Sequence, residues 1–99
     1  MGLFNIAEAD DRLVFTFPER MDTLACEKYQ GRIESDIGSS GRPVTFDLSG
    51  VAYVASSFLR ICLKAAATAG KDRFELIHAR PEIKKVFKIA CLDQQLALR

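Results

Sequence analysis

Residues 3–17 (LFNIAEADDRLVFTF) alternate between apolar and polar positions in the manner of β-strands. Phe15 and Phe17 share one side of the second run, as expected for a strand with one face in a core. The pair Asp10–Asp11 interrupts the alternation with residues that favour turns. The pattern therefore predicts two strands joined at Asp10–Asp11, the second of which ends before Pro18.

Residues 21–38 (MDTLACEKYQGRIESDIG) change to the longer period of a helix. Four residues have the spacing of one helical face: Cys26, Tyr29, Ile33 and Ile37. Asp22 or Thr23 is a suitable N-cap for this helix. Gly31 in its interior costs about 1 kcal/mol relative to alanine. Residues 38–43 (GSSGRP) have the composition of a loop.

The second half of the chain predicts strands and helices in alternation. Residues 44–48 (VTFDL) and 73–79 (RFELIHA) are short apolar runs typical of buried strands. A helix is expected from about Ser57 to Ala69, with Gly70 placed where a C-terminal glycine stop belongs. Pro81 occupies the preferred first-turn position of a last helix.

The same periodicities assign an inner face to each of these elements. In the helix over residues 57–69 the inner face is predicted to hold Leu59, Cys62, Leu63 and Ala66, with Arg60 and Lys64 outward. In the last helix it is predicted to hold Ile83, Val86, Phe87 and Ala90. The residues expected to be largely buried are Phe46, Leu48, Leu63, Leu76 and Phe87.

The predicted order of elements is β-β-α-β-α-β-α, and residues 96–99 (LALR) could add a short final strand. A strand, a helix and a strand in succession imply a right-handed crossover and parallel pairing. The fold class is therefore α/β, with a small mixed sheet of four to five strands and helices mainly on one side.

Size and charge limit the function classes. The 99 residues fit a single domain over residues 1–99. Fourteen basic and thirteen acidic residues leave a net charge of +1, which gives no electrostatic case for nucleic acid or anionic membranes. Lys84, Lys85 and Lys88 are the expected solvated face of the last helix. With no apolar run of membrane-spanning length and no signal peptide, we expect a cytoplasmic protein.

Catalytic patterns are missing from the sequence. It contains no glycine-rich phosphate loop and no pairing of a nucleophile with a local base, and His78 is its only histidine. Cys26, Cys62 and Cys91 are odd in number and irregularly spaced, unlike a disulfide framework or a zinc site. We therefore expect no enzyme activity, no metal and no cofactor.

Two adjacent serines mark the junction between the run at 51–55 and the helix that follows. One hydroxyl is enough to cap a helix, so we expect the two serines to have different roles. Ser56 is placed to cap, and Ser57 is expected to be open to modification. A helix N-terminus tolerates an anion because its N–H groups are unpaired. Capping without any modification is the alternative.

Residues 44–70 (VTFDLSGVAYVASSFLRICLKAAATAG) resemble the central block of STAS domains, the fold shared by bacterial anti-sigma factor antagonists and the cytoplasmic tails of sulfate transporters. Residues 47–49 match the Asp-Leu-Ser that ends a buried strand in that family, and residues 55–59 match its Asp-Ser-Ser-Gly-Leu. PERMD, with Met21–Asp22, resembles the turn into the first helix. Residues 79–93 resemble the final helix, so the resemblance covers nearly the whole chain.

The resemblance implies a regulatory protein without enzyme activity. In antagonists of this type an anti-sigma factor with serine-kinase activity phosphorylates the second serine, and the unmodified antagonist binds that kinase and frees the sigma factor. By position the acceptor here is Ser57, with Ser56 as runner-up. The partner-binding residues transferred in this way are Asp22, Ser56, Ser57, Phe58 and Arg60. No direct contact with nucleic acid is implied, and we expect a monomer or a weak dimer.

Two positions depart from the family pattern: Ala55 replaces the acidic residue before the serines, and Phe58 replaces the glycine after them. Phe58 is accordingly either an exposed anchor for a partner or a lid over the local core. The alternative function is a STAS interaction subunit that is never phosphorylated, within a larger signalling or transporter complex.

Overall fold

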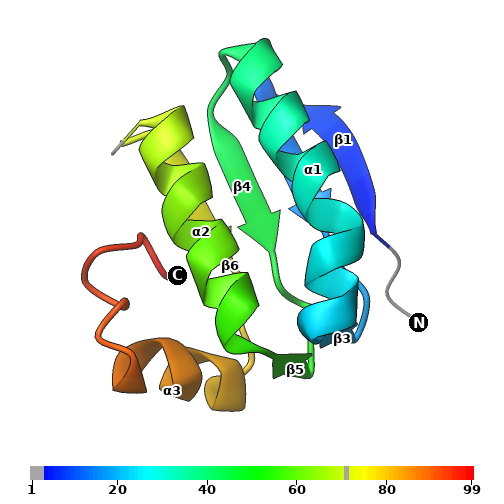
Figure 1. Cartoon of the computed structure of the whole chain (residues 1–99). Helices are drawn as coiled ribbons and strands as arrows, with labels where there is room; N and C mark the ends of the chain where they lie inside the picture. Colours follow the sequence, from blue (N-terminus) through cyan, green and yellow to red (C-terminus); the bar gives the residue numbers. More distant parts are fainter. Residues whose placement is uncertain (1–3, 71) are drawn as a thin grey trace.

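Two long helices lie side by side across one face of a four-stranded sheet in the computed structural model, which describes residues 4–70 and 72–99 (Figure 1). The strands of this sheet are β1 (Asn5–Ala9), β2 (Arg12–Thr16), β4 (Val44–Asp47) and β6 (Phe74–Ile77). The helices are α1 (Thr23–Ser40), α2 (Ser56–Ala69) and α3 (Pro81–Ile89). A separate two-stranded sheet consists of β3 (Arg20–Met21) and β5 (Tyr53–Val54).

The main sheet has the strand order β1-β2-β4-β6, with an antiparallel hairpin at one edge and parallel pairs beyond it. Asp10 and Asp11 form the hairpin turn with φ angles of 52° and 64°. Such left-handed conformations at both central residues match the right-handed twist of a hairpin, and aspartate tolerates them. The predicted hairpin is therefore confirmed, although Leu3, where the prediction began, lies outside the described residues.

Helices α1 and α2 are the crossovers from β2 to β4 and from β4 to β6, and both cover the same face of the sheet (Figure 1). This arrangement confirms the predicted α/β class and the mixed sheet of four strands. Residues 96–99 form no full strand, because a single parallel bridge between Leu76 and Leu98 attaches them to β6.

The short β3–β5 pair was not predicted, because two-residue strands are too short to show a period. Arg20 lies opposite Tyr53, and Met21 opposite Val54. The amide of Ala55 also donates to the carbonyl of Met21 at 2.9 Å. These bonds hold the start of α2 beside the start of α1, so that both helix N-termini emerge at one end of the molecule (Figure 1).

Phenylalanine rings form the centre of the core between the sheet and the two helices. Phe46 on β4 packs against Phe17 and Phe74 with ring centroids 4.9 and 5.0 Å away. Four of the predicted core residues are confirmed as fully buried: Phe46, Leu48, Leu76 and Phe87. Leu63 is the exception, since 37% of its surface is exposed and it lies on the outer side of α2.

Several helix ends agree with the predicted chemistry, including Gly70, which ends α2 as expected, and others differ. Asp22 is the N-cap of α1 and accepts a hydrogen bond from the amide of Ala25 at 3.0 Å. Pro81 opens α3 as predicted. Helix α1 continues past the predicted end to the left-handed Gly41, whose φ is 65°. Ala90, predicted to face the core, is exposed just beyond α3.

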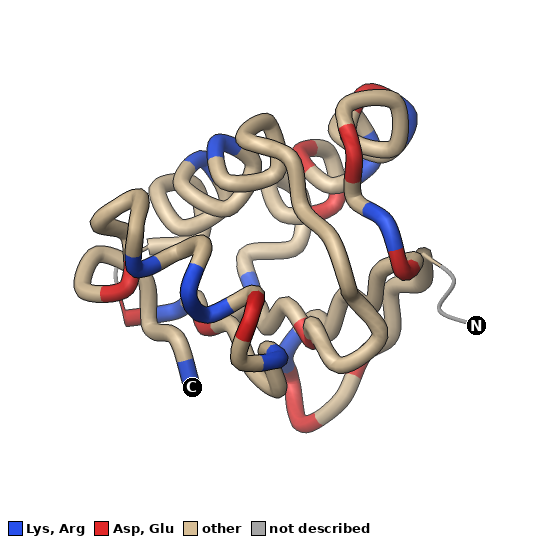
Figure 2. The backbone as a smooth tube through the Cα atoms, turned by 90° about the horizontal axis from the view of Figure 1, so that it is seen from below, with Lys and Arg blue, Asp and Glu red and all other residues tan. Residues whose placement is uncertain are grey.

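Charged residues of both signs are interspersed along the chain (Figure 2). Lys84, Lys85 and Lys88 are exposed on α3, as expected for a solvated face. Within residues 4–70 and 72–99, none of the helices has the length and apolarity needed to cross a bilayer.

Candidate functional site

Helix α2 begins without a side-chain cap. Ala55 is its N-cap residue, with φ −89° and ψ 165°, and its side chain has no oxygen that could accept a hydrogen bond from the helix. Ser56 is already the first helical residue, and its side chain is exposed. The prediction that Ser56 caps this helix is therefore wrong, because the helix starts one residue earlier than its sequence pattern indicated.

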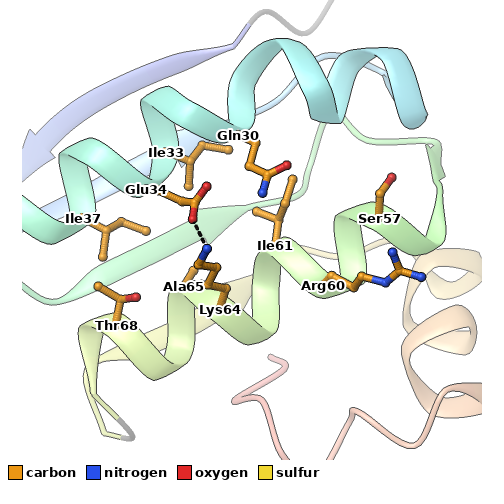
Figure 3. A pocket seen from close by; sticks show the side chains of 10 residues that line it. All are labelled: Gln30, Ile33, Glu34, Ile37, Ser57, Arg60, Ile61, Lys64, Ala65 and Thr68. Carbon is orange, nitrogen blue, oxygen red and sulfur yellow. Dashed lines mark ion pairs between the residues drawn. The ribbon is translucent and has the colours of Figure 1, made fainter.

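Ser57 lies in the first turn of α2, as predicted, but its hydroxyl is not open to solvent. Its Oγ atom is buried, and its polar neighbour on α1 is the Cys26 thiol. In Figure 3 the side chain points from α2 towards α1. The expectation of an exposed hydroxyl is thus wrong for this conformation, and Ser56 is the accessible member of the pair.

Cys26 on α1 shares this buried environment with Ser57. Burial raises the pKa of the Cys26 thiol, the neighbouring Ser57 hydroxyl opposes that rise, and the charge of Asp22 adds to it. The sulfur lies 3.8 Å from the Met21 carbonyl oxygen. The thiol is therefore held protonated, and it behaves as a small apolar side chain rather than as a nucleophile.

Phe58 lies in the core and not on the surface, with 0% of its area exposed. Its ring meets that of Phe17 edge to face, with centroids 5.2 Å apart. The lid interpretation is thus correct and the exposed-anchor interpretation is wrong. The buried face of α2 comprises Phe58, Ile61, Cys62 and Ala65. Their regular helical spacing was visible in the sequence, but the predicted face began one residue too late.

Asp22 and Arg60 lie near the serine pair and remain accessible. Asp22 caps α1 through one oxygen and faces Arg20 Nε through the other at 3.8 Å. Arg60 is exposed one turn after Ser57 on α2 and has no ion pair within the part of the chain that the structure describes. Both side chains therefore lie at the surface beside the serine pair.

Sequence reasoning missed two exposed apolar side chains at the same end of the molecule. Leu24 in the first turn of α1 is 76% exposed, and Tyr53 on β5 is 44% exposed. The guanidinium of Arg20 lies over the Tyr53 ring, 4.7 Å from its centroid. Tyr53 had no sequence signal as a surface residue, because only the unpredicted β3–β5 pair fixes its direction.

A groove of about 170 Å³ runs between α1 and α2 and ends at Ser57 (Figure 3). Its apolar lining consists of Ile33, Ile37, Ile61 and Ala65. Its polar lining consists of Gln30, Glu34, Ser57, Arg60, Lys64 and Thr68. An ion pair between Lys64 and Glu34 joins the two helices across it. The hydrogen bond from Lys64 holds the pKa of the Glu34 carboxyl below its usual value, so Glu34 stays ionised and its charge is compensated by Lys64.

Asp47, at the end of β4, organises the turn that leads towards the serine pair. Its Oδ1 accepts a hydrogen bond from the Ser49 amide at 3.0 Å and lies 3.3 Å from Nδ1 of His78. Burial acts to raise the pKa of Asp47, but the hydrogen bonds from Ser49 and His78 outweigh it and leave the pKa below its usual value. This residue therefore fixes the backbone at the carboxyl end of the sheet.

No group of three or more histidine, cysteine, aspartate or glutamate residues within residues 4–70 and 72–99 is close enough together to hold an ion. Cys26 and Cys62 are buried, and Cys91 is exposed as a free thiol.

Comparison with known proteins finds solved structures with the same fold. Neither a protein-family model nor a curated protein matches the sequence. Among solved structures, an anti-sigma-factor antagonist (STAS) domain protein from Planctomyces limnophilus has a TM-score of 0.85 at 20% identity, over 97% of this chain and 87% of that one. An anti-sigma factor antagonist from Mycobacterium paratuberculosis has a TM-score of 0.83 at 20% identity, over 99% and 85%. The anti-sigma factor antagonist SpoIIAA in its unphosphorylated form has a TM-score of 0.81 at 17% identity, over 97% and 87%.

These likenesses show that the chain has the STAS fold. The resemblance of residues 44–70 to the central block of STAS domains is thereby confirmed at the level of architecture. SpoIIAA of Bacillus has also been solved in its phosphorylated form, which this chain matches with a TM-score of 0.72 at 18% identity, over 97% of this chain and 90% of that one.

Proposed function

We propose that this chain is a bacterial anti-sigma factor antagonist, a cytoplasmic protein without enzyme activity whose binding to an anti-sigma factor is controlled by phosphorylation. The observation that carries the proposal is the position of the serine pair. Ser56 and Ser57 form the first turn of α2 within a STAS fold, beyond the carboxyl end of β4. Binding regions of open α/β sheets usually lie at that edge.

The proposed acceptor is Ser57, which corresponds to the second serine of the family motif. The partner is an anti-sigma factor with serine-kinase activity, which binds the unmodified antagonist and releases its sigma factor. A phosphate would add about −2 of charge and three acceptor oxygens to the docking surface. The N-terminus of α2 accommodates an anion electrostatically, so the main effect falls on the partner's side of the contact.

The buried Ser57 hydroxyl adds a requirement to this mechanism. Because Oγ has no exposed surface in this conformation, phosphoryl transfer needs Ser57 to change rotamer or the first turn of α2 to open. Ser57 as a whole is only half-buried, so the movement is local. Ser56 is exposed already and is the runner-up acceptor.

The same observation favours a second candidate, a STAS interaction subunit that is not phosphorylated. A hydroxyl that stays buried is not a kinase substrate, and Ala55 lacks the acidic group of the family motif. Such a module would use the surface around Asp22 and Arg60 as a constitutive contact.

Recovery of the protein from its native host, followed by intact-mass measurement, tests the proposal. We expect an anti-sigma factor to be captured and a fraction of the protein to be one phosphate heavier. The heavier species should disappear in Ser57→Ala and persist in Ser56→Ala. Capture of a partner without any phosphate under inducing and non-inducing growth would favour the unphosphorylated subunit instead.

A further inference from the structure

The hydroxyl of Ser57 is enclosed between the first turns of α1 and α2. Its Oγ atom is buried, and the side chain points from α2 towards α1 (Figure 3). The polar group beside it there is the thiol of Cys26, a residue that is itself only 1% exposed. Buried hydroxyls almost always have a hydrogen-bond partner, because an unpaired one is energetically costly. The thiol is therefore the group that stabilises the inward orientation of Ser57.

The direction of this contact follows from the other neighbour of the sulfur. Cys26 Sγ lies 3.8 Å from the carbonyl oxygen of Met21, to which the thiol donates. The sulfur is then free to accept from the Ser57 hydroxyl. The effect of Ser57 on Cys26 agrees with this direction, because a donor to the sulfur stabilises the thiolate and so lowers the thiol pKa.

The same Met21 carbonyl accepts a hydrogen bond from the amide of Ala55, the N-cap residue of α2, at 2.9 Å. Met21 therefore lies between the start of α2 and the thiol that meets Ser57. Cys26 is fixed in turn by its amide, which donates to the carbonyl of Asp22 at 2.9 Å. The sulfur thus has a defined position relative to the first turn of α2.

The contact between hydroxyl and thiol is weak enough to open. Sulfur is a weak hydrogen-bond acceptor, so it restrains the hydroxyl less than an oxygen would. Ser57 as a whole is only half-buried, and rotation about its χ1 angle is enough to turn the hydroxyl outward. When only one of two orientations can react, the observed rate is proportional to the fraction of molecules in that orientation.

We propose that Cys26 is a positioning residue for the phosphorylation of Ser57: its thiol holds the hydroxyl inward and sets the fraction of molecules in which a kinase can reach it. This inference rests on the proposed phosphorylation of Ser57. In the transfer, Ser57 Oγ forms a bond to the γ-phosphorus of ATP, the bond from that phosphorus to ADP breaks, and the hydroxyl proton passes to a base of the kinase. Only the outward orientation presents Oγ to that phosphorus.

Coupling constants between Hα and the two Hβ protons of Ser57 test the restraint without any kinase. In the isotope-labelled wild-type protein they should report one dominant rotamer. Cys26→Ala removes the acceptor, so the couplings should move towards a rotamer average, and Cys26→Ser supplies an oxygen and should restore one rotamer. Cys62→Ala is the matched control, because it removes a thiol from a fully buried position of α2. That position lies about 140° around the helix from Ser57, so the couplings should stay as in the wild type.

Phosphorylation by the captured anti-sigma factor kinase and ATP, with the modified residue located by fragment masses, tests the consequence. Cys26→Ala should raise kcat/KM for Ser57 by roughly fivefold, the factor expected for loss of one hydrogen bond. Cys26→Ser should react at the wild-type rate or more slowly, and Cys62→Ala at the wild-type rate. Both alanine variants leave a cavity and should lower the melting temperature. A rate that rises only in Cys26→Ala is therefore not a consequence of lower stability.

Two results would overturn the role of Cys26 while phosphorylation of Ser57 stands. Unchanged Ser57 couplings in Cys26→Ala would show that the thiol does not hold the hydroxyl. A wild-type rate in Cys26→Ala, together with altered couplings, would show that the orientation of the hydroxyl does not limit the transfer. Absence of phosphate from Ser57 in the wild type and in every variant would instead overturn the phosphorylation of Ser57 itself, and the role of Cys26 with it.

Discussion

The ring of Phe58 meets the ring of Phe17 edge to face, with centroids 5.2 Å apart, and joins the first turn of α2 to the core. Phe17 in turn packs against Phe46 on the central strand β4, at 4.9 Å. The residue that replaces the family's small glycine is thus a structural element of this chain. The start of α2, which carries the serine pair, is fixed from beneath by an aromatic cluster.

Phe58→Ala should destabilise the protein by about 3–5 kcal/mol, because it removes a fully buried aromatic side chain and leaves a cavity. Urea unfolding at a fixed temperature measures this change. Leu24→Ala is the matched control, since that side chain is 76% exposed, and it should change stability by less than about 0.5 kcal/mol. Equal effects of the two substitutions would contradict the assigned inner face of α2.

The first turns of α1 and α2 should respond differently when a polar side chain is replaced by alanine. Asp22→Ala should cost about 1 kcal/mol, because the hydrogen bond to the Ala25 amide is lost. Ser56→Ala should be nearly neutral, since α2 has no side-chain cap to lose. Thermal melts of both variants give the comparison, and a larger loss for Ser56→Ala would show that Ser56 caps α2 in solution.

Two glycines at different backbone conformations provide a second matched pair. Gly31→Ala should stabilise the protein by about 1 kcal/mol, because Gly31 lies within α1 and a methyl group there meets open space. Gly41→Ala should destabilise it, because Gly41 ends α1 with φ at 65°, where a side chain is strained. Chemical denaturation of both variants tests this, and a stabilising Gly41→Ala would be inconsistent with the left-handed end of α1.

Asp47 predicts an acid-dependent contribution to stability. Its pKa in the folded protein is lower than in the unfolded chain, owing mainly to Ser49 and His78 acting against burial. The contribution is therefore present above the unfolded pKa of about 4 and is lost as the pH falls through the lower folded value. The stability difference between wild type and Asp47→Asn should therefore shrink as the pH falls from about 5 to below the folded pKa of Asp47. A difference that grows as the pH falls would mean that the pKa is shifted in the opposite direction.

Much of the architecture could be predicted because long elements show their period. The hairpin at Asp10–Asp11 and the crossover order were readable from alternation and from turn residues, and the parallel pairs followed from chain connectivity. What failed were statements that depend on one residue. The inner face of α2 includes Phe58 and excludes Leu63. It is therefore turned by one residue from the predicted face, and the spacing of four apolar residues could not distinguish these two orientations.

The candidate site shows the same limit more strongly. The position of Ser57 in the first turn of α2 was predictable from the break in pattern before the helix. The burial of its hydroxyl was not, because it depends on how closely α1 approaches α2. That approach is set by the β3–β5 pair, whose two-residue strands have no sequence signature, and by the hydrogen bond from Ala55 to Met21.

The most direct test of the account is a titration of the purified anti-sigma factor with the wild-type protein and with variants of the serine pair. If Ser57 is the switch, Ser57→Asp weakens binding by roughly tenfold or more through added charge at the docking surface, while Ser57→Ala binds at wild-type strength and resists the kinase. Ser56→Asp carries the same charge one residue away and serves as the control, with a smaller loss expected. Wild-type affinity for Ser57→Asp, combined with no phosphate on the wild-type protein after incubation with the kinase and ATP, would contradict the switch.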